Sequence, residues 1–377
     1  MSAKRSVVGI YLDAEYDITS KWLVNGAVRI ENYSDFGFTD NYKFATRFKA
    51  IPKLNLRGSV STGFRAPSLQ QINFSSTFTT VQAGNIAEVK IAPNYNSITK
   101  AAGIPELKQE RSVNASAGFA WQAAKGFSVT IDGYWVQVKD RVVISGQFDG
   151  SDANLDAGLR AQMGALNVSL AQFFANAVNT TNKGVDIVVD YNRKWGHHRI
   201  KGLFAGNFQS MEIDKINIPA KLSGSEFLRQ TFLSDREQKF ILASAPKNKF
   251  ALNLEYGHQE LTVGTRFTYF GEVVLLGYVQ DGLGINPMVP LDKGIGDVPD
   301  RYNYSGKLVT DIYASYQVNK NLTVYIGADN LLNVHPDFGV VKGAKDWAYN
   351  TETGGAWDAV QMGFNGRRLF ARIGFSF

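Results

Sequence analysis

Apolar residues recur at every second position in many separate stretches of the chain. The last stretch alternates Leu369, Ile373 and Phe375 with small or charged neighbours. A period of two is typical of a β-strand with one apolar and one polar face. About thirteen stretches share the pattern, and each is long enough to cross a bilayer as a tilted strand. They are 7–19, 21–33, 42–51, 53–65, 110–122, 126–141, 183–194, 198–210, 248–257, 260–271, 307–318, 321–332 and 364–377.

The connections between these stretches alternate between short and long. Short turns are predicted near residues 20, 52, 124, 196, 258 and 320. Long connections are predicted at 34–41, 66–109, 142–182, 211–247, 272–306 and 333–363. Soluble sandwiches rarely place a long loop at every second connection, whereas outer-membrane barrels combine tight periplasmic turns with long extracellular loops. The pattern therefore predicts an all-β, antiparallel transmembrane β-barrel, with Leu369, Ile373 and Phe375 facing away from its axis.

Composition and charge change this picture in a few respects. The chain has 25 Phe, 16 Tyr and 6 Trp, and aromatic residues at strand ends suit the interfacial girdles of a barrel. No stretch approaches the roughly 18 apolar residues of a membrane helix. Cysteine is absent, which excludes disulfides and thiolate metal sites. The net charge of +6 is spread without a basic run, so no nucleic-acid partner is expected.

Five motifs resemble, in family order, those of TonB-dependent outer-membrane receptors. They are STGFRAPSLQQ (61–71), GIPELKQERSVNASAGF (103–119), IDGYWVQVKDRV (131–142), GADNLLNVHPD (327–337) and GFNGRRLFARIGFSF (363–377). The resemblance covers essentially all of residues 1–377. It implies a bacterial outer-membrane location and a barrel of about 22 strands, of which this chain would be the C-terminal portion. It also implies that the barrel-assembly machinery reads the terminal Phe377.

Strand direction gives a second reason to expect a partial barrel. With short turns in the periplasm, the stretches 364–377 and 7–19 both run inward, so Met1 lies on the extracellular side. Bacterial barrels normally have an even strand number and both termini in the periplasm. Thirteen strands would leave two unpaired edges that lipid cannot satisfy. We therefore expect further strands, a plug domain and a TonB box upstream, none of which is found in this chain.

The residues of the family motifs carry structural expectations. Pro67 cannot donate to a strand ladder and should end a strand, while Arg65 should pair with a carboxylate. Asn330 and Asn333 are expected to cap a turn. The motif positions with expected structural roles are Gly63, Phe64, Arg65, Ala66, Pro67, Leu107, Lys108, Glu110, Asn330 and Phe377.

Ligand recognition is expected in the long loops, because loops on a rigid scaffold usually carry it. Aromatic residues in 272–306 and 333–363 suit stacking on a sugar ring or an aromatic chelator. The candidates are Tyr278, Tyr302, Tyr304, Trp347, Tyr349 and Trp357. The alternative is that these rings pack the loops against one another. Segment 154–176 breaks the two-residue period and predicts a short amphipathic helix over the barrel mouth.

Chemical signatures are few, so we expect no enzyme activity, no cofactor and no metal. No Ser/His/Asp arrangement, HExxH motif or phosphate-binding loop occurs in the sequence. His197 and His198 are interpreted, like His258, as solvated turn residues, while His335 could contact a metal chelate or haem. The inward carboxylates are expected to pair with Arg57, Arg266 and Arg372 as lumen lining rather than act as general acids or bases. These carboxylates are Asp186, Asp190, Glu255, Asp311 and Asp329.

Three functions are compatible with these observations. The first is TonB-energised uptake of a bulky nutrient such as a ferric siderophore, haem, cobalamin or an oligosaccharide. The second is a structural or docking subunit of an outer-membrane complex, for example with a surface lipoprotein. The third is a soluble β-rich binding module or surface enzyme. The first implies three partners, namely outer-membrane lipid, the barrel-assembly machinery and the TonB complex through the missing N-terminal part.

Overall fold

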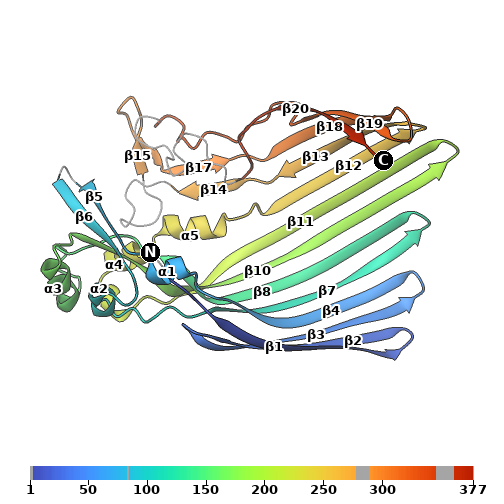
Figure 1. Cartoon of the computed structure of the whole chain (residues 1–377). Coiled ribbons are helices and arrows are strands. Elements are labelled where there is room, and N and C mark those ends of the chain that lie inside the picture. The colour runs from blue at the N-terminus through green and yellow to red at the C-terminus, as the bar shows by residue number, and fades with distance from the viewer. Residues whose placement is uncertain (1–2, 83–84, 277–287, 345–360, 377) are drawn as a thin grey trace.

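Thirteen strands follow one another in a single antiparallel meander (Figure 1). The computed structural model describes residues 3–82, 85–276, 288–344 and 361–376. Each of the thirteen stretches predicted from the period of two corresponds to a strand, although the strand in 364–377 begins only at Arg368 and the one in 321–332 ends at Asp329. The path runs β1 (Val7–Thr19), β2 (Trp22–Tyr33), β3 (Gly37–Ile51), β4 (Leu54–Arg65), β7 (Glu110–Ala124), β8 (Phe127–Ile144), β10 (Leu170–Trp195), β11 (His198–Ile216), β12 (Asn248–His258), β13 (Leu261–Phe270), β18 (Lys307–Gln317), β19 (Leu322–Asp329) and β20 (Arg368–Phe375).

Short hairpin turns join these strands at one end of the sheet, which we call the turn end. All six lie where the sequence predicts them, between β1 and β2, β3 and β4, β7 and β8, β10 and β11, β12 and β13, and β18 and β19. Gly126, in the third of these turns, has φ +75°, and an added Cβ would lie 2.0 Å from the carbonyl oxygen of Asn192. Only glycine fits there, because the turn packs directly on the backbone of β10.

The opposite end, which we call the loop end, carries the long connections. β1 begins at the loop end and β20 finishes at the turn end, as strand direction predicts (Figure 1). Short elements fill these connections. They are α1 (Leu69–Asn73), β5 (Ser76–Gln82), β6 (Asn85–Ala92), α2 (Ser97–Ala101), β9 (Phe148–Asp149), α3 (Ala157–Ala165), a 3-10 turn (Ala220–Leu222), α4 (Glu226–Phe232), α5 (Asp235–Leu242), β14 (Val273–Leu276), β15 (Met288–Pro290), β16 (Asp297–Pro299) and β17 (Arg301–Tyr304). No helix in the described part of the chain is long and apolar enough to cross a membrane.

Several strands extend further toward the loop end than the sequence predicts. β10 has 26 residues and starts at Leu170, inside the predicted loop 142–182. Its added part pairs with β8 as far as Phe174 opposite Ile144, and with β11 as far as Val178 opposite Ile216. The predicted connection 34–41 is also wrong, because β3 already begins at Gly37. In both places cross-strand pairing continues beyond the alternating pattern.

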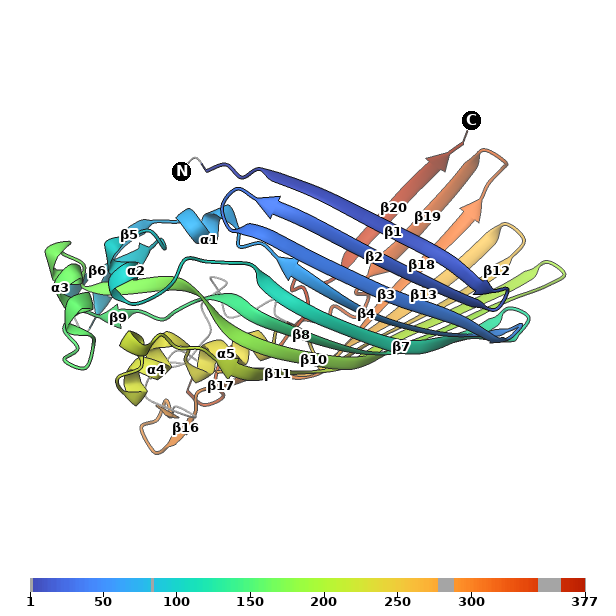
Figure 2. The ribbon, with the colours of Figure 1, turned by 90° about the horizontal axis from the view of Figure 1, so that it is seen from below.

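The predicted helix at 154–176 is only partly correct. Helix α3 covers Ala157–Ala165, with Asp156 accepting a hydrogen bond from the Leu159 amide as its N-cap. From Leu170 the chain is strand instead, and Leu170–Phe173 pair in parallel with Val89–Ala92 of β6. Figure 2 shows α3 at the far loop end, beside β6 and β9. The apolar residues after α3 form a strand, because the backbones of β6 and β9 provide hydrogen-bond partners for them.

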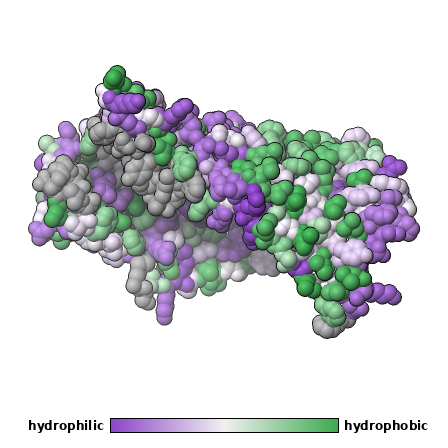
Figure 3. Space-filling view, turned by 90° about the horizontal axis from the view of Figure 1, so that it is seen from above, coloured by the Kyte–Doolittle hydropathy of each residue, from purple (hydrophilic) through white to green (hydrophobic). Residues whose placement is uncertain are grey.

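The two faces of the sheet differ in chemistry. The sheet curves from β1 round to β20 (Figure 2), and on its concave face side chains reach across an intervening strand. Arg57 on β4 hydrogen-bonds Asp132 on β8 past β7, and Tyr313 on β18 reaches Glu255 on β12 past β13. The convex face holds exposed apolar side chains such as Ile10, Phe44, Val60, Ile326 and Ile373. Figure 3 shows hydrophobic side chains over the strands and hydrophilic ones at the turn end.

The last strand follows this division. Leu369, Ile373 and Phe375 are 74%, 74% and 60% exposed and lie on the convex face, on the side that the sequence predicts. Arg372 alternates with them on the concave face, where its guanidinium lies 5.6 Å from the ring centre of Tyr325. An apolar convex face with a polar concave face is the reverse of a soluble barrel and is typical of a sheet surrounded by lipid.

The fully buried large side chains gather at the loop end. One cluster joins β6, β9, α2, α3, α4 and the extended parts of β10 and β11, with Phe148, Leu159, Met163, Phe173 and Phe232 at its centre. A second joins the region after α5, β14, β15, β17 and residues 341–344. We call these loop core 1 and loop core 2. The long connections thus have hydrophobic cores of their own.

Candidate functional site: the loop end and the concave wall

A carboxylate at the top of β7 connects three strands. Arg65, the last residue of β4, makes a two-point ion pair with Glu110, its register partner on β7. Glu110 Oε1 also accepts a hydrogen bond from the Val142 amide of β8 at 2.9 Å. The Glu110 side chain is buried while Arg65 is largely exposed. Arg65 therefore pairs with a carboxylate, as expected, and that carboxylate also anchors β8.

The residues around Arg65 pack closely against their neighbours. An added Cβ at Gly63 would lie 2.8 Å from the hydroxyl oxygen of Ser112, so the adjacent strand leaves little room for a side chain. The Phe64 ring meets Tyr33 edge-on at 5.7 Å. The carbonyl oxygen of Pro67 accepts a hydrogen bond of 2.6 Å from Arg5. The strand ends at Arg65, and Ala66 and Pro67 lead into α1.

The entry to β7 is fixed by an asparagine that the sequence analysis did not single out. Leu107 is buried, and the exposed Lys108 is held through its backbone. The Asn176 side chain accepts from the Lys108 amide and donates to the Lys108 carbonyl, both at 2.9 Å, and also donates to the Asp140 carbonyl at 2.7 Å. Asn176 therefore links the 66–109 connection to β8 and β10.

The turn after β19 is closed by asparagine side chains, as expected. Asn330 has φ +49°, and its side chain donates to the Val334 carbonyl and accepts from the Val334 amide at 2.7 and 2.8 Å. Asn333 has φ +56° and accepts from the Arg367 amide at 2.9 Å. Asparagine tolerates this left-handed backbone better than most residues, because its side chain bonds locally.

The predicted ligand-stacking aromatics fall into two groups. Tyr302 and Tyr304 are 3% and 0% exposed and belong to loop core 2. Burial, reinforced by the neighbouring Asp300 carboxylate, raises the pKa of Tyr302 above its usual value. Neither ring presents a face to solvent, which is the packing arrangement named above as the alternative. Tyr278, Trp347, Tyr349 and Trp357 lie outside the described residues, as does Phe377.

A carboxylate anchors the segment that follows β19. Asp337 accepts from the Ser305 amide at 2.6 Å and pairs with Lys307 Nζ at 2.5 Å. Burial alone would raise the pKa of Asp337, but the bonds from Lys307 and Ser305 outweigh it and hold the pKa below its usual range. The contact joins residues 305–307 to the connection between β19 and β20.

The concave wall is lined by charged and polar groups, but not in the predicted pairs. Among the described residues, Arg57 pairs with Asp132, Arg266 donates to Asn253 at 2.7 Å, and Arg372 lies over Tyr325. None of the three meets a carboxylate from the predicted set, so that pairing is wrong. Arg266 lies opposite Asp311 in register, but its guanidinium donates to Asn253, its register partner on β12.

The predicted carboxylates have different partners. Glu255 accepts from Tyr313 at 2.8 Å and forms an ion pair with Lys201 at 3.0 Å. Asp329 accepts from Arg368 at 2.8 Å. Asp186 accepts from the Asn207 side chain and Asp311 accepts from the Asn330 amide, both at 2.8 Å. Asp190 lines a pocket of about 410 Å³ on the concave face, together with Lys201, Asn253, Glu255 and Arg266. The predicted role of these groups as polar lining fits this arrangement.

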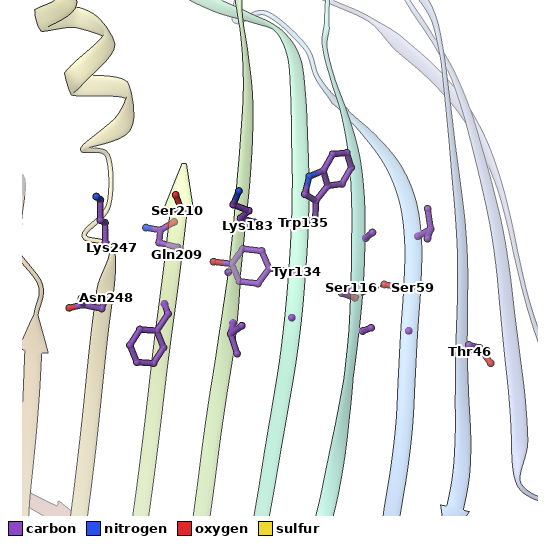
Figure 4. A pocket seen from close by; sticks show the side chains of 18 of the residues that line it. Thr46, Ser59, Ser116, Tyr134, Trp135, Lys183, Gln209, Ser210, Lys247 and Asn248 are labelled. Carbon is purple, nitrogen blue, oxygen red and sulfur yellow. Dashed lines mark hydrogen bonds between the residues drawn. The ribbon is translucent and has the colours of Figure 1, made fainter. Parts of the chain in front are cut away.

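A larger groove, of about 1050 Å³, is mostly apolar (Figure 4). Phe44, Val60, Trp135 and Phe208 line it from convex-face positions, and small residues such as Gly133 lie between them. Figure 4 shows Tyr134 and Trp135 on β8 and Lys183 on the neighbouring β10. The groove lies on the apolar outer surface, a position that suits lipid chains rather than a polar ligand.

Metal ligands are sparse in the described part of the chain. No group of three or more His, Asp or Glu side chains there could hold a metal ion. His335 Nδ1 lies 3.2 Å from the carbonyl oxygen of Phe364, which suits donation to that oxygen. Contact of His335 with a metal chelate or haem remains a prediction.

A family model described as "TonB dependent receptor-like, beta-barrel" matches residues 2–331. The chain belongs to this family. Homologues in this family are outer-membrane proteins, so the match argues against the soluble binding module and leaves nutrient uptake and a docking role as the alternatives. No curated protein matches the sequence.

Solved structures of TonB-dependent receptors share the fold. The siderophore receptor PirA from Acinetobacter baumannii matches 99% of this chain with a TM-score of 0.63 and 16% identity. A PfeA mutant from Pseudomonas aeruginosa in complex with enterobactin has a TM-score of 0.65 at 13% identity, and the FrpB iron transporter from Neisseria meningitidis 0.57 at 15%. This TonB-dependent receptor barrel spans about half the length of those structures, 46%, 46% and 45% respectively.

Proposed function

We propose that the chain forms the C-terminal part of the barrel of an outer-membrane receptor that takes up a bulky nutrient by TonB-energised transport. The observation that carries the proposal is the position of the packed loop end above a polar concave wall, within a sheet whose outer surface is apolar. A rigid loop scaffold can hold a ligand at the entrance, and a polar wall suits a water-filled lumen.

The proposed orientation places the loop end outside the cell and the turn end in the periplasm. Outer-membrane lipid would cover the convex face. The remaining strands, the plug and the TonB box would be supplied upstream of this chain, and the barrel-assembly machinery would read the terminal Phe377.

A ferric siderophore is the proposed ligand class. The supporting facts are that PirA is named a siderophore receptor, that PfeA is named a ferric enterobactin receptor, and that FrpB is named an iron transporter. At identities of 13–16% these likenesses show the fold alone. The binding experiment described next therefore decides the ligand class. Haem, cobalamin and an oligosaccharide are the competing ligands.

The test is binding of ferric siderophores, haem, cobalamin and oligosaccharides to the purified receptor, followed by uptake in cells with and without TonB. We expect one ferric siderophore to bind and its uptake to need TonB. Replacing Trp347, Tyr349 and Trp357 together by alanine should weaken binding by about 1–3 kcal/mol if the rings stack on ligand. A correctly folded receptor that binds none of these compounds would favour the structural or docking role.

A further inference from the structure

Two hairpins at the turn end bring together histidines that are far apart in the sequence. His198 begins β11 and His258 ends β12, and the two are direct register partners. Their Nδ1 atoms lie 3.2 Å apart, and the Tyr256 hydroxyl lies 2.7 Å from His198 Nδ1. Trp195 stacks on the other side of His198, with ring centres 5.5 Å apart. The two imidazoles are half-buried, within a cluster of exposed rings.

This spacing is the one that two nitrogen ligands need around a single metal ion. Nitrogens at about 2.0–2.1 Å from a tetrahedral ion lie roughly 3.3 Å from each other. The Cβ–Cγ torsion of histidine is soft, so small ring rotations can aim both Nδ1 lone pairs at one ion. The flanking Trp195 and Tyr256 rings restrict larger movements of His198.

We propose that His198 and His258 form a two-imidazole site for a divalent late first-row transition-metal ion at the turn end. The ion takes the place of the hydrogen bond between the two Nδ1 atoms. The proton of that bond moves through solvent to Nε2 of the same ring, so that each imidazole offers an Nδ1 lone pair. Water and the Tyr256 hydroxyl are available for the remaining positions. Imidazole ligands suit Zn²⁺, Ni²⁺ and Cu²⁺, and Cu²⁺ binds most tightly in the general order of divalent ions.

Such a site would add a metal bridge between two hairpins that already meet through the backbone and through side chains such as Arg199 and Glu255. Gln259 donates its amide to the His197 carbonyl at 3.1 Å, next to the imidazole pair. A bound ion would therefore pin the β10–β11 turn to the β12–β13 turn. With two imidazoles instead of three or four ligands, binding would be reversible.

The test is a Cu²⁺ titration of the intact protein in detergent, made without a histidine tag. Calorimetry gives the affinity, and pulsed EPR counts the imidazoles bound to the ion. We expect the unaltered protein to bind one ion through two imidazoles. Each of the variants His198→Gln and His258→Gln should weaken the affinity by about tenfold or more and bind the ion through one imidazole. His197→Gln is the matched control, because His197 is exposed in the same turn, and it should change neither readout.

Three results would overturn the site. The first is a single bound imidazole in the unaltered protein, a measurement that requires no variant. The second is equal affinity in the unaltered protein and in a folded His198→Gln/His258→Gln double variant. The third is loss of the signal in His197→Gln alone, which would move binding to the turn. Heat-modifiable migration confirms that each variant is folded.

Discussion

At the scale of single residues, the polar groups of the loop end are held by partners that are far away in the sequence and lie on adjacent strands. Glu110 accepts from Arg65 on one neighbouring strand and from the Val142 amide on the other. Asn176 accepts from the Lys108 amide and donates to the Asp140 carbonyl. Because a buried acceptor without a donor costs free energy, each contact fixes where the neighbouring connection leaves the sheet.

Replacing Glu110 by alanine should destabilise the receptor by about 1–3 kcal/mol, because the Val142 amide loses its buried acceptor. Arg65→Ala should cost less, about 1 kcal/mol or below, because the guanidinium is mostly exposed and screened by water. The measurement is the midpoint of urea unfolding. Glu106→Ala is the control, since Glu106 is an exposed carboxylate in the same connection. An equal effect of Glu106→Ala and Glu110→Ala would contradict this account.

The Asp337 contact should weaken in acid. The pKa of Asp337 is lowered from 3.8 in the folded state, so the unfolded state takes up the proton more readily. Its stabilising contribution is therefore present above about pH 4 and lost as the pH falls through the lower folded-state pKa. Amide hydrogen exchange at Ser305, corrected for the intrinsic rate, should rise in that range. Asp337→Asn should remove this pH dependence, and an unchanged profile in that variant would refute the assignment.

At the scale of elements, the loop end is built from pieces too short to be stable alone. Helix α3 has nine residues, and β6 pairs in parallel with only Leu170–Phe173 of β10. Isolated helices of that length are marginal in water, so their stability comes from the apolar residues they bury. Loop core 1 therefore determines whether these elements form.

Leu159→Ala should destabilise loop core 1 by about 2–5 kcal/mol, because Leu159 is fully buried and its loss leaves a cavity. We expect faster cleavage of the 145–169 connection by protease on intact cells, while the strands stay protected. Leu166, just after the same helix, is 50% exposed, so Leu166→Ala should have little effect. Equal cleavage of the two variants would show that the core does not hold the loops.

At the scale of the whole molecule, the sheet separates an apolar convex face from a polar concave face. Ile326 is 58% exposed on the convex side, while Thr323 alternates to the concave side of the same strand. The division follows strictly from register, since a shift of one residue would exchange the two sets. Insertion into a bilayer should therefore depend on which face carries a charge.

Ile326→Lys should reduce the amount of heat-modifiable receptor in the outer-membrane fraction. A lysine on the lipid face near the bilayer centre costs about 2–4 kcal/mol. Thr323→Lys, on the same strand but facing the lumen, should leave the amount nearly unchanged. If both variants inserted equally well, lipid would not be what covers the convex face.

The sequence by itself determined the strands, the six hairpin turns and the faces of each strand. These features are local, because a period of two and a turn residue act within about ten neighbouring positions. The stretch 248–257, for example, is strand β12 within one residue. The family motifs were equally readable, and Arg65 pairs with a carboxylate as expected.

Only the tertiary structure decided how the loop end and the side-chain partners are arranged. Leu170 belongs to a strand because β6, some eighty residues away, pairs beside it, with Leu170 opposite Val89. Tyr304 is buried because several connections fold onto it, and His198 meets His258 because β11 lies next to β12. These outcomes depend on contacts between distant segments, and the hydrophobic pattern of a single segment does not specify which distant surface covers it.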